Sequence, residues 1–342
     1  MRLLFASTFG HLPELVGGLQ TTTDELAQAL RRRGIEVAVL CATIDLTATV
    51  PRADRLCGYQ VVRAPEPALA LPAVVAALQP SAIVVQTGPG LVQLLIAAVE
   101  SGVPTAVYLH NVEQAELGGA LLPDPSVLYL ANSRFTAARW QAAFGLASEV
   151  VPPYVERDAY LTETSRERIL FVNPTVPKGV ERMFQLAAAR PTLPFTVAES
   201  WALQPEWRRF CQDRAARLGN IEWLAPTRDM RALYGRARLL LMPSLWEETY
   251  GRTVVEAQLN GIPVLASSRG NLADTVGPGG IVIDLHAPLD SWAAALDRLW
   301  LDAGRRYAVA AQAHARRAEI DPARIVDRFA DLLSRHSQTL AA

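Results

Sequence analysis

The sequence has very little lysine. Of its 33 basic side chains only Lys178 is a lysine, and it lies between Pro177 and Gly179 in the stretch FVNPTVPKGV, directly after an apolar run. Codon bias alone can leave a single lysine by chance. Alternatively, a compact ammonium with three rotatable donors is needed where a planar guanidinium does not fit, as against phosphate oxygens. The other motifs of the chain bear on this choice.

Cysteine is also scarce, with Cys41, Cys57 and Cys211 spread through 342 residues. An odd number of cysteines without C-x-x-C spacing argues against a disulfide framework and gives no indication of a zinc site. A reducing compartment fits this usage best.

Strong net charge and long apolar runs are absent as well. A formal net charge of −1 gives no electrostatic footprint for nucleic acid. No stretch offers 18 clean apolar residues for a membrane span, and the first 18 residues lack the features of a signal peptide. We therefore expect a cytoplasmic protein. The basic run at 31–33 leaves open a weak peripheral contact with the inner membrane face, against the alternative of a solvated helix end.

Continuously apolar runs predict buried parallel strands in the first half of the chain. These runs are LLFAS (3–7), VAVLC (37–41), AIVVQ (82–86), TAVYL (105–109) and VLYLA (127–131). Helical segments at 21–34 and 91–102 lie between them, closed by Gly34 and Gly102. Because strands and helices alternate, we expect a parallel sheet with helices on both faces.

The same alternation restarts after a polar connector at 149–168. The second set of predicted strands is RILFVN (168–173), PFTVAE (194–199), IEWLA (221–225), RLLLMPS (238–244), IPVLAS (262–267) and GIVID (280–284). Two doubly wound halves place a cleft between them, and ligands of such sheets bind outside the carboxyl ends of the strands. A final helix at 321–336 is expected to pack back across the interface.

The stretch LWEETYGRTVVEAQLNG (245–261) combines two carboxylates with a predicted helix start. Gly251 precedes a short helix expected at 252–260, and the unpaired N–H groups of a helix amino terminus favour anions. Glu248 lies before this helix and Glu256 on it. Side chains so placed reach different parts of a bound molecule and cannot share one proton.

This stretch, extended from Pro243 to Ser267, resembles the signature of retaining GT-B glycosyltransferases, in particular those of family 4 (group 1). The family pattern is a Glu, seven residues and a second Glu, followed by A-x-x-x-G-x-P-V-x-A-S. Glu248 and Glu256 match the two glutamates. The matching residues after them are Ala257, Gly261, Pro263, Val264, Ala266 and Ser267.

Other stretches resemble the same family in order and spacing. Gly17 and Gly18 stand in its first glycine-rich loop, and His110 stands where the family has a histidine facing the donor sugar. Asn271 and Leu272 lie at the centre of SSRGNLADTVGPGGIVID, which resembles the loop whose backbone N–H groups hold the diphosphate. The resemblance thus covers most of the chain.

The resemblance implies an α/β fold of GT-B type, with two Rossmann-like doubly wound domains facing a central cleft. Residues 1–155 would form the acceptor-binding domain and residues 156–322 the domain that binds the nucleotide sugar. Residues 323–342 would form a C-terminal helix that crosses back to the N-terminal domain.

The loop that contains Lys178 departs from the family pattern. The family usually has G-R, a few residues and K-G there, and the Arg and Lys together neutralise the diphosphate leaving group. Lys178 and Gly179 match, whereas Asn173 and Pro174 stand where Gly and Arg are expected. Losing one such donor typically costs about a hundred- to a thousandfold in rate. We hypothesise that Arg252 or Arg269 takes the role of the missing arginine.

The resemblance also implies roles for individual residues. Lys178, Glu248 and His110 would be catalytic. Glu256 would bind the ribose hydroxyls, and Leu224 would contact the base through its main chain. The full set of implied donor-binding residues is Gly17, Gly18, Asn173, Leu224, Tyr250, Gly251, Arg252, Thr253, Glu256, Arg269, Asn271 and Leu272.

The implied reaction needs no metal and no bound cofactor. A sugar would pass with retention from a nucleotide diphosphate sugar, UDP ahead of GDP, to a saccharide or lipid-linked acceptor, as in polysaccharide assembly. Two alternatives stay open, namely a nucleotide-sugar epimerase of the same architecture and a catalytically silent sugar-nucleotide binder or partner subunit. An incomplete G-x-G-x-x-G at 88–90 and the lack of a P-loop disfavour dinucleotide oxidoreductases and P-loop kinases.

Overall fold

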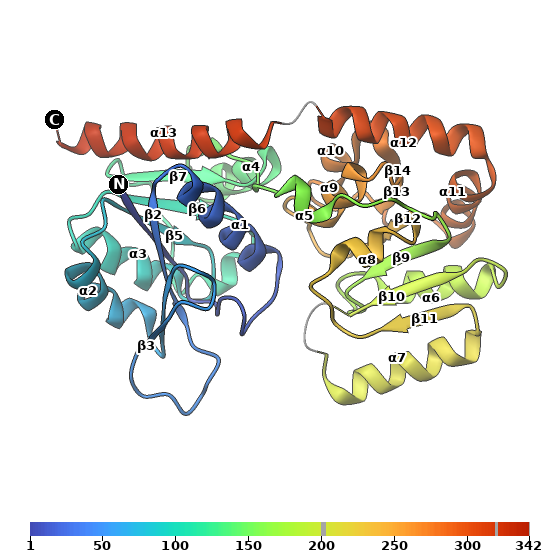
Figure 1. Cartoon of the computed structure of the whole chain (residues 1–342), viewed down its shortest axis with the longest axis horizontal. Coiled ribbons are helices and arrows are strands. Elements are labelled where there is room, and N and C mark those ends of the chain that lie inside the picture. The colour runs from blue at the N-terminus through green and yellow to red at the C-terminus, as the bar shows by residue number, and fades with distance from the viewer. Residues whose placement is uncertain (200–202, 319–320, 342) are drawn as a thin grey trace. The chain divides into compact units, whose positions relative to one another are not determined.

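The structure is a computed structural model that describes residues 1–199, 203–318 and 321–341. The chain forms two compact units (Figure 1). Unit 1 comprises Met1–Tyr154 and Pro322–Ala342, and unit 2 comprises Val155–Asp321. The two divisions fall one residue before the boundaries expected from the sequence. Each unit contains its own sheet with helices on both faces, which confirms the predicted fold class.

Unit 1 contains a sheet of eight strands in the order β3-β4-β2-β1-β5-β6-β7-β8, parallel except for the β3–β4 pair. The five strands expected from apolar runs are β1 (Arg2–Ala6), β2 (Glu36–Ala42), β5 (Ala82–Gln86), β6 (Thr105–Leu109) and β7 (Val127–Ala131). Three further strands were not predicted, namely β3 (Arg52–Asp54), β4 (Gln60–Ala64) and β8 (Glu149–Val150).

Strand β4 escaped prediction because Arg63 interrupts its apolar run. The Arg63 side chain is fully buried, and its Nε lies 2.7 Å from Asp54 Oδ2. Its other nitrogens donate to the carbonyl oxygens of His11 and Leu12, at 3.1 and 2.6 Å. A buried guanidinium is tolerated where its donors are satisfied in this way.

The helices of unit 1 are α1 (Gly18–Arg32), α2 (Pro67–Leu78), α3 (Leu91–Glu100), α4 (Arg134–Phe144) and α13 (Pro322–Ala341), with a short 3-10 helix η1 (Gln114–Glu116). Helix α13 packs on α1 and on one face of the sheet, as the sequence predicts (Figure 1). Its Phe329 is fully buried and stacks on Phe5 of β1, with ring centroids 6.0 Å apart.

Unit 2 contains an all-parallel sheet of six strands in the order β11-β10-β9-β12-β13-β14. Its strands correspond to the six predicted runs and are β9 (Arg168–Val172), β10 (Phe195–Ala198), β11 (Ile221–Leu224), β12 (Ala237–Met242), β13 (Val264–Ser267) and β14 (Gly280–Ile283). The carboxyl ends of parallel strands meet at one edge, so the loops that follow β9, β12 and β13 are neighbours.

The helices of unit 2 are α5 (Arg157–Tyr160), α6 (Val180–Ala189), α7 (Pro205–Leu218), α8 (Met230–Tyr234), α9 (Arg252–Leu259), α10 (Leu272–Val276), α11 (Leu289–Leu301) and α12 (Ala303–Ala318), with a 3-10 helix η2 (Gly277–Gly279). Residues 149–168, predicted to be a connector, contain β8 and α5. Among the helices of the described ranges, none is both long and apolar enough to cross a bilayer.

Candidate active site

Three loops at the carboxyl edge of the unit 2 sheet are held together by backbone hydrogen bonds. The N–H groups of Leu245 and Trp246, after β12, donate to the carbonyl oxygen of Pro177 in the loop after β9, at 2.8 and 2.9 Å. The N–H of Asn271, in the loop after β13, donates to the carbonyl oxygen of Glu248 at 2.7 Å. These bonds fix the position of Lys178 relative to Glu248.

Lys178 and Glu248 form a close ion pair in this loop cluster. The Lys178 Nζ lies 2.5 Å from Glu248 Oε1, and the hydroxyl of Ser244 donates to the same oxygen at 2.8 Å. The two side chains are only 16% and 10% exposed. The one lysine of the chain therefore lies beside one of the two motif glutamates and not in bulk solvent.

Two glycines allow the loops to approach this closely. Gly179 has φ +80°, and a Cβ added to it would lie 1.9 Å from the carbonyl oxygen of Pro243. Gly270 has φ +62°, and a Cβ there would lie 2.3 Å from the carbonyl oxygen of Glu248. Any other residue would be strained in the left-handed region and would overlap backbone atoms at both positions.

Asn173, which stands where the family pattern has Gly, also adopts a left-handed conformation, with φ +68°. Asparagine tolerates this region better than most residues, so the departure preserves the backbone of the loop. The Oδ1 of Asn173 and the Oγ1 of Thr175 are buried and have no hydrogen-bond partner among the described residues. Buried polar atoms without partners are uncommon and call for an explanation.

Glu256 is buried on α9, only 3% exposed, and is held by side chains from two helices. Its Oε1 lies 2.7 Å from the Nε of Arg252, and its Oε2 accepts a hydrogen bond of 2.7 Å from the Tyr234 hydroxyl. The Nη2 of Arg252 donates to the hydroxyl of Tyr160 at 2.8 Å, with the guanidinium 5.4 Å from the centroid of that ring. Glu256 is thus part of a buried, hydrogen-bonded network.

The two arginines considered as replacements for the missing family arginine have different surroundings. Arg252 is 10% exposed and is paired with Glu256. Arg269 is 38% exposed, and its Nε donates to the carbonyl oxygen of Leu245 at 3.1 Å. Which of them faces a bound diphosphate stays a hypothesis.

Several main-chain groups expected to meet the donor are hydrogen-bonded within the protein. The N–H of Asn271 donates to the carbonyl oxygen of Glu248, and the N–H of Leu272 donates to the carbonyl oxygen of Arg269 at 3.3 Å. The carbonyl oxygen of Leu224, at the end of β11, accepts from the N–H of Glu199 at 3.1 Å. Their roles in donor binding stay predictions.

The residues around the start of α9 are placed by local contacts. Gly251 is the N-cap of α9, with φ +81°. The carbonyl oxygen of Tyr250 accepts a hydrogen bond from the Thr275 hydroxyl, and the Thr253 hydroxyl lies 3.6 Å from the sulfur of Met242. The chain at 250–253 is therefore anchored to α10 and to the end of β12.

The other predicted site residues, His110, Gly17 and Gly18, lie in unit 1. His110 directly follows β6, its Nε2 is 3.5 Å from Gln86 Nε2, and its ring packs on Tyr108 with centroids 4.0 Å apart. Burial lowers the pKa of His110 to about 3, so the imidazole is neutral at pH 7. Gly17 is the N-cap of α1, and a Cβ added to Gly18 would meet no atom within 4 Å. Packing of the chain itself therefore does not require glycine at position 18.

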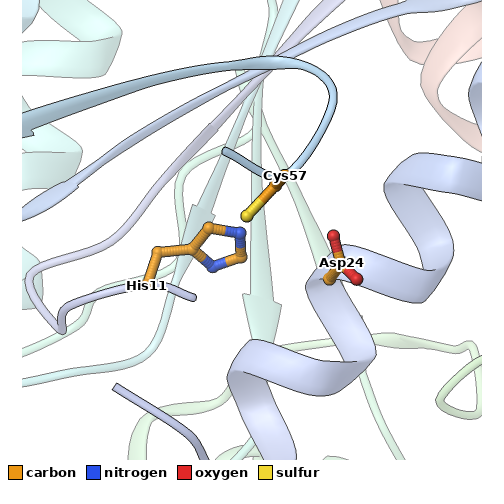
Figure 2. A group of neighbouring side chains, drawn as sticks. All are labelled: His11, Asp24 and Cys57. Carbon is orange, nitrogen blue, oxygen red and sulfur yellow. The ribbon is translucent and has the colours of Figure 1, made fainter. Parts of the chain in front are cut away.

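His11, Asp24 and Cys57 in unit 1 have ligand atoms within 4.8 Å of one another (Figure 2). The Tyr59 hydroxyl donates to Asp24 Oδ1 at 2.8 Å and lies 2.7 Å from His11 Nε2, and the Cys57 thiol donates to the carbonyl oxygen of Leu12 at 3.3 Å. A hydroxyl has one hydrogen, so His11 Nε2 must donate to Tyr59. His11 and Asp24 are thus already linked through this hydroxyl, and Cys57 is bonded to the main chain, so the cluster is explained by hydrogen bonds within the protein.

Two Rossmann-like units, one with a largely parallel and one with an all-parallel sheet, are typical of the GT-B fold. The family description "Glycosyl transferases group 1" matches residues 155–316, and "Glycosyltransferase Family 4" matches residues 16–159. Together the two matches span both units. The chain belongs to the group 1, family 4 glycosyltransferases, which are transferase enzymes.

Curated relatives match the chain over part of their length. The D-inositol 3-phosphate glycosyltransferase of Salinispora tropica is 36% identical over 138 residues, which are 37% of this chain and 28% of that protein. The enzyme of the same name from Stackebrandtia nassauensis is 27% identical over 266 residues, 64% of this chain and 60% of that protein. The matched region thus spans less than two thirds of either relative.

Solved structures share the fold over nearly the whole chain. Sucrose-phosphate synthase from Thermosynechococcus elongatus is 16% identical, with a TM-score of 0.78 over 98% of both chains. HepE from Anabaena, solved in complex with UDP-glucose, is 19% identical, with a TM-score of 0.80 over 98% of this chain and 100% of that one. At these identities the likeness shows the GT-B fold alone.

The structure also contains residues at the site that the sequence did not single out. Ser244 bonds the same oxygen of Glu248 as Lys178 does, and Tyr234 and Tyr160 belong to the network around Glu256. Ser244 could have been noticed, because it ends a predicted strand directly before the motif. The two tyrosines carry no such signal, since only tertiary packing brings α5 and α8 to α9.

Proposed function

We propose that the protein is a retaining, metal-independent glycosyltransferase that moves a sugar from a nucleotide diphosphate sugar to a saccharide or lipid-linked acceptor. The observation that carries the proposal is the partly buried pair of Lys178 and Glu248 at the carboxyl edge of the unit 2 sheet. Ligands of doubly wound sheets bind at this edge. A fixed cation and a hydrogen-bond acceptor there suit a diphosphate and the hydroxyls of a sugar.

In this proposal, Lys178 stabilises the negative charge that develops on the departing nucleoside diphosphate. Glu248 binds hydroxyls of the transferred sugar, and Glu256 binds the ribose. Without donor, the ammonium of Lys178 and the carboxylate of Glu248 neutralise each other. Donor binding brings phosphate oxygens to the lysine and sugar hydroxyls to the glutamate, so both groups keep a partner when their contact loosens. The partnerless atoms of Asn173 and Thr175 in the same loop support a polar ligand there.

The neutral imidazole of His110 supports retention. Direct inversion needs a side-chain base that takes the proton of the acceptor hydroxyl, and a group with a pKa of about 3 is a weak base at neutral pH. We propose that His110 contacts the sugar as a neutral group. The acceptor's proton then passes to a phosphate oxygen of the donor on the same face of the sugar.

We propose a UDP-sugar as donor, ahead of a GDP-sugar. The structural similarity to HepE, whose complex contains UDP-glucose, supports uridine. The curated relatives that match over part of the chain carry the name D-inositol 3-phosphate glycosyltransferase, which supports a polyhydroxylated acceptor. Lys178 supplies positive charge that a metal ion would otherwise bring to the diphosphate, which supports the proposed metal independence.

A donor panel tests this function. The protein is incubated with UDP-, GDP- and ADP-sugars, each with and without EDTA, and released nucleoside diphosphate is measured together with the configuration of the sugar. We expect slow hydrolysis of one donor with retained anomeric configuration, unchanged by EDTA. Isomerised donor would indicate an epimerase, and binding without turnover a silent binder. Loss of turnover in EDTA would contradict metal independence.

A further inference from the structure

We propose that Tyr234 and Arg252 are positioning residues that hold the carboxylate of Glu256 in the orientation that binds the ribose of the donor. This inference rests on the proposed function and extends it to two side chains that touch the glutamate and not the sugar. It also gives Arg252 a different task from that of a cation for the diphosphate.

The first observation is the way in which the carboxylate is held. Each oxygen of Glu256 has its own partner. The Tyr234 hydroxyl donates to Oε2 at 2.7 Å, and the Arg252 guanidinium forms an ion pair with Oε1, with its Nε 2.7 Å away. Because the two partners come from different helices, α8 and α9, they hold the plane of the carboxylate and not only its position. A buried carboxylate of this kind costs little only while its oxygens are paired or hydrogen-bonded.

The second observation is that both partners of Glu256 are themselves held in place. Tyr234 has no exposed surface, and burial together with the nearby Glu256 charge raises its pKa, so that the hydroxyl keeps its hydrogen and remains a donor. Arg252 is held from its far side by Tyr160, through a hydrogen bond of 2.8 Å and the ring below its guanidinium. Tyr160 is itself tied to α9, because its carbonyl oxygen accepts from Asn260 Nδ2 at 3.0 Å.

The geometry distinguishes this role from a diphosphate contact. The Arg252 guanidinium is already engaged on two sides, because its Nε lies 2.7 Å from Glu256 Oε1 in an ion pair and its Nη2 donates to the Tyr160 hydroxyl. A guanidinium turned toward a phosphate would have to leave both partners and would uncover a buried carboxylate. Lys178, whose loop is joined to that of Glu248, is the cation better placed for the phosphates.

The test measures ribose discrimination by binding. Affinities for UDP and for 2′-deoxy-UDP are determined by titration calorimetry, or for the matching pair if the donor panel selects another base. We expect the wild type to prefer UDP by about tenfold or more, the usual scale of a hydrogen bond to a charged group. In Tyr234→Phe the preference should fall by about fivefold, and in Glu256→Gln it should nearly vanish. The double variant should behave like Glu256→Gln.

Two controls keep the outcome interpretable. Tyr129→Phe removes another mostly buried tyrosine hydroxyl, bonded to the carbonyl oxygen of Leu122 in unit 1, and should leave both affinities unchanged. Arg252→Gln tests the second positioning residue. It also gives an independent test of the proposal if Tyr234→Phe does not fold. It should lower ribose discrimination while the preference for UDP over UMP stays near the wild-type value.

The proposal is overturned if Tyr234→Phe folds and keeps the wild-type preference for UDP over 2′-deoxy-UDP. It is equally overturned for Arg252 if Arg252→Gln loses the preference for UDP over UMP and keeps ribose discrimination. These results differ from failure of the proposed function, in which the wild type binds none of the nucleotides.

Discussion

Among single residues, Lys178 is the one lysine that the chain keeps. Lys178 lies within 2.5 Å of a carboxylate oxygen, in a loop bounded by Gly179, whose backbone approaches Pro243 closely. A guanidinium is larger and planar, and it cannot take the same place without moving one of these neighbours. The surroundings therefore favour a need for the ammonium over chance survival of one lysine codon.

Substitution of Lys178 separates these two interpretations. Lys178→Met removes the charge at similar length, and we expect turnover of the best donor to fall about a hundred- to a thousandfold, because one fixed electrostatic contact in the transition state is lost. Lys178→Arg restores the charge with the wrong shape and should stay at least tenfold below the wild type. Initial rates at saturating donor measure both. Wild-type turnover in Lys178→Arg would mean that the lysine is there by chance.

The pKa values of His110 and His11 predict how the stability of the protein depends on pH. Burial lowers the pKa of His110 to about 3, and burial together with Arg63 lowers that of His11 to about 4, against 6.5 for each in the unfolded chain. Below pH 6.5 the unfolded chain therefore binds protons that the folded chain does not. The free energy of unfolding should fall as pH drops from 6.5 toward 4.

Urea unfolding at about pH 7 and pH 5 measures this loss. His110→Gln removes one of the two groups, so the variant should lose less stability between the two pH values than the wild type does. An equal loss in both proteins would show that His110 titrates normally in the folded state.

At the scale of elements, the sequence predicted strands well where the chain is continuously apolar. The runs at 82–86, 105–109 and 127–131 coincide with β5, β6 and β7. Such runs are buried on both faces of a parallel sheet, so their pattern is unambiguous. Strand β4 was missed because Arg63 is buried by partners distant in sequence, Asp54 among them. The residues next to Arg63 in the sequence do not indicate which distant residues will pair with it.

The site residues likewise fall into two groups, those that a local motif indicates and those that only tertiary packing brings together. Lys178, Glu248 and Glu256 could be proposed because each lies in a short motif next to a predicted strand. Two members of the network around Glu256 are distant in sequence. Tyr160 on α5 precedes Glu256 by 96 positions, and Tyr234 on α8 precedes it by 22. Only the packing of unit 2 brings them together. The functional roles of all these residues remain predictions.

The close approach of the loop after β9 to the end of β12 leads to a prediction about stability. Gly179 and Gly219 both have a left-handed backbone, with φ +80° and +76°. An added Cβ at Gly219 would meet nothing within 4 Å, whereas at Gly179 it would overlap the Pro243 carbonyl. Gly219→Ala should therefore cost about 1–2 kcal/mol for the left-handed backbone alone.

Gly179→Ala should cost clearly more than Gly219→Ala and should also lower turnover, because the loop that carries Lys178 must move away from β12. Urea unfolding and initial rates of both variants measure this difference. Equal unfolding free energies and equal rates would show that the close approach of the two loops is not required.

At the scale of the whole molecule, the two units differ in how the chain builds them. Unit 2 is a single stretch, residues 155–321, whereas unit 1 joins residues 1–154 with 322–342. The buried residues of α13 that complete the unit 1 core include Val326, Phe329 and Leu333. The core beneath the first strand of the chain therefore depends on its last helix.

Unit 2 is thus inserted into unit 1. The ribosome therefore synthesises all of unit 2 before the last segment of unit 1, residues 322–342. A premature stop after residue 321 would leave every residue of the Lys178 and Glu256 sites in place and would strip apolar cover from Phe5. Changes in α13 would therefore alter the packing of β1.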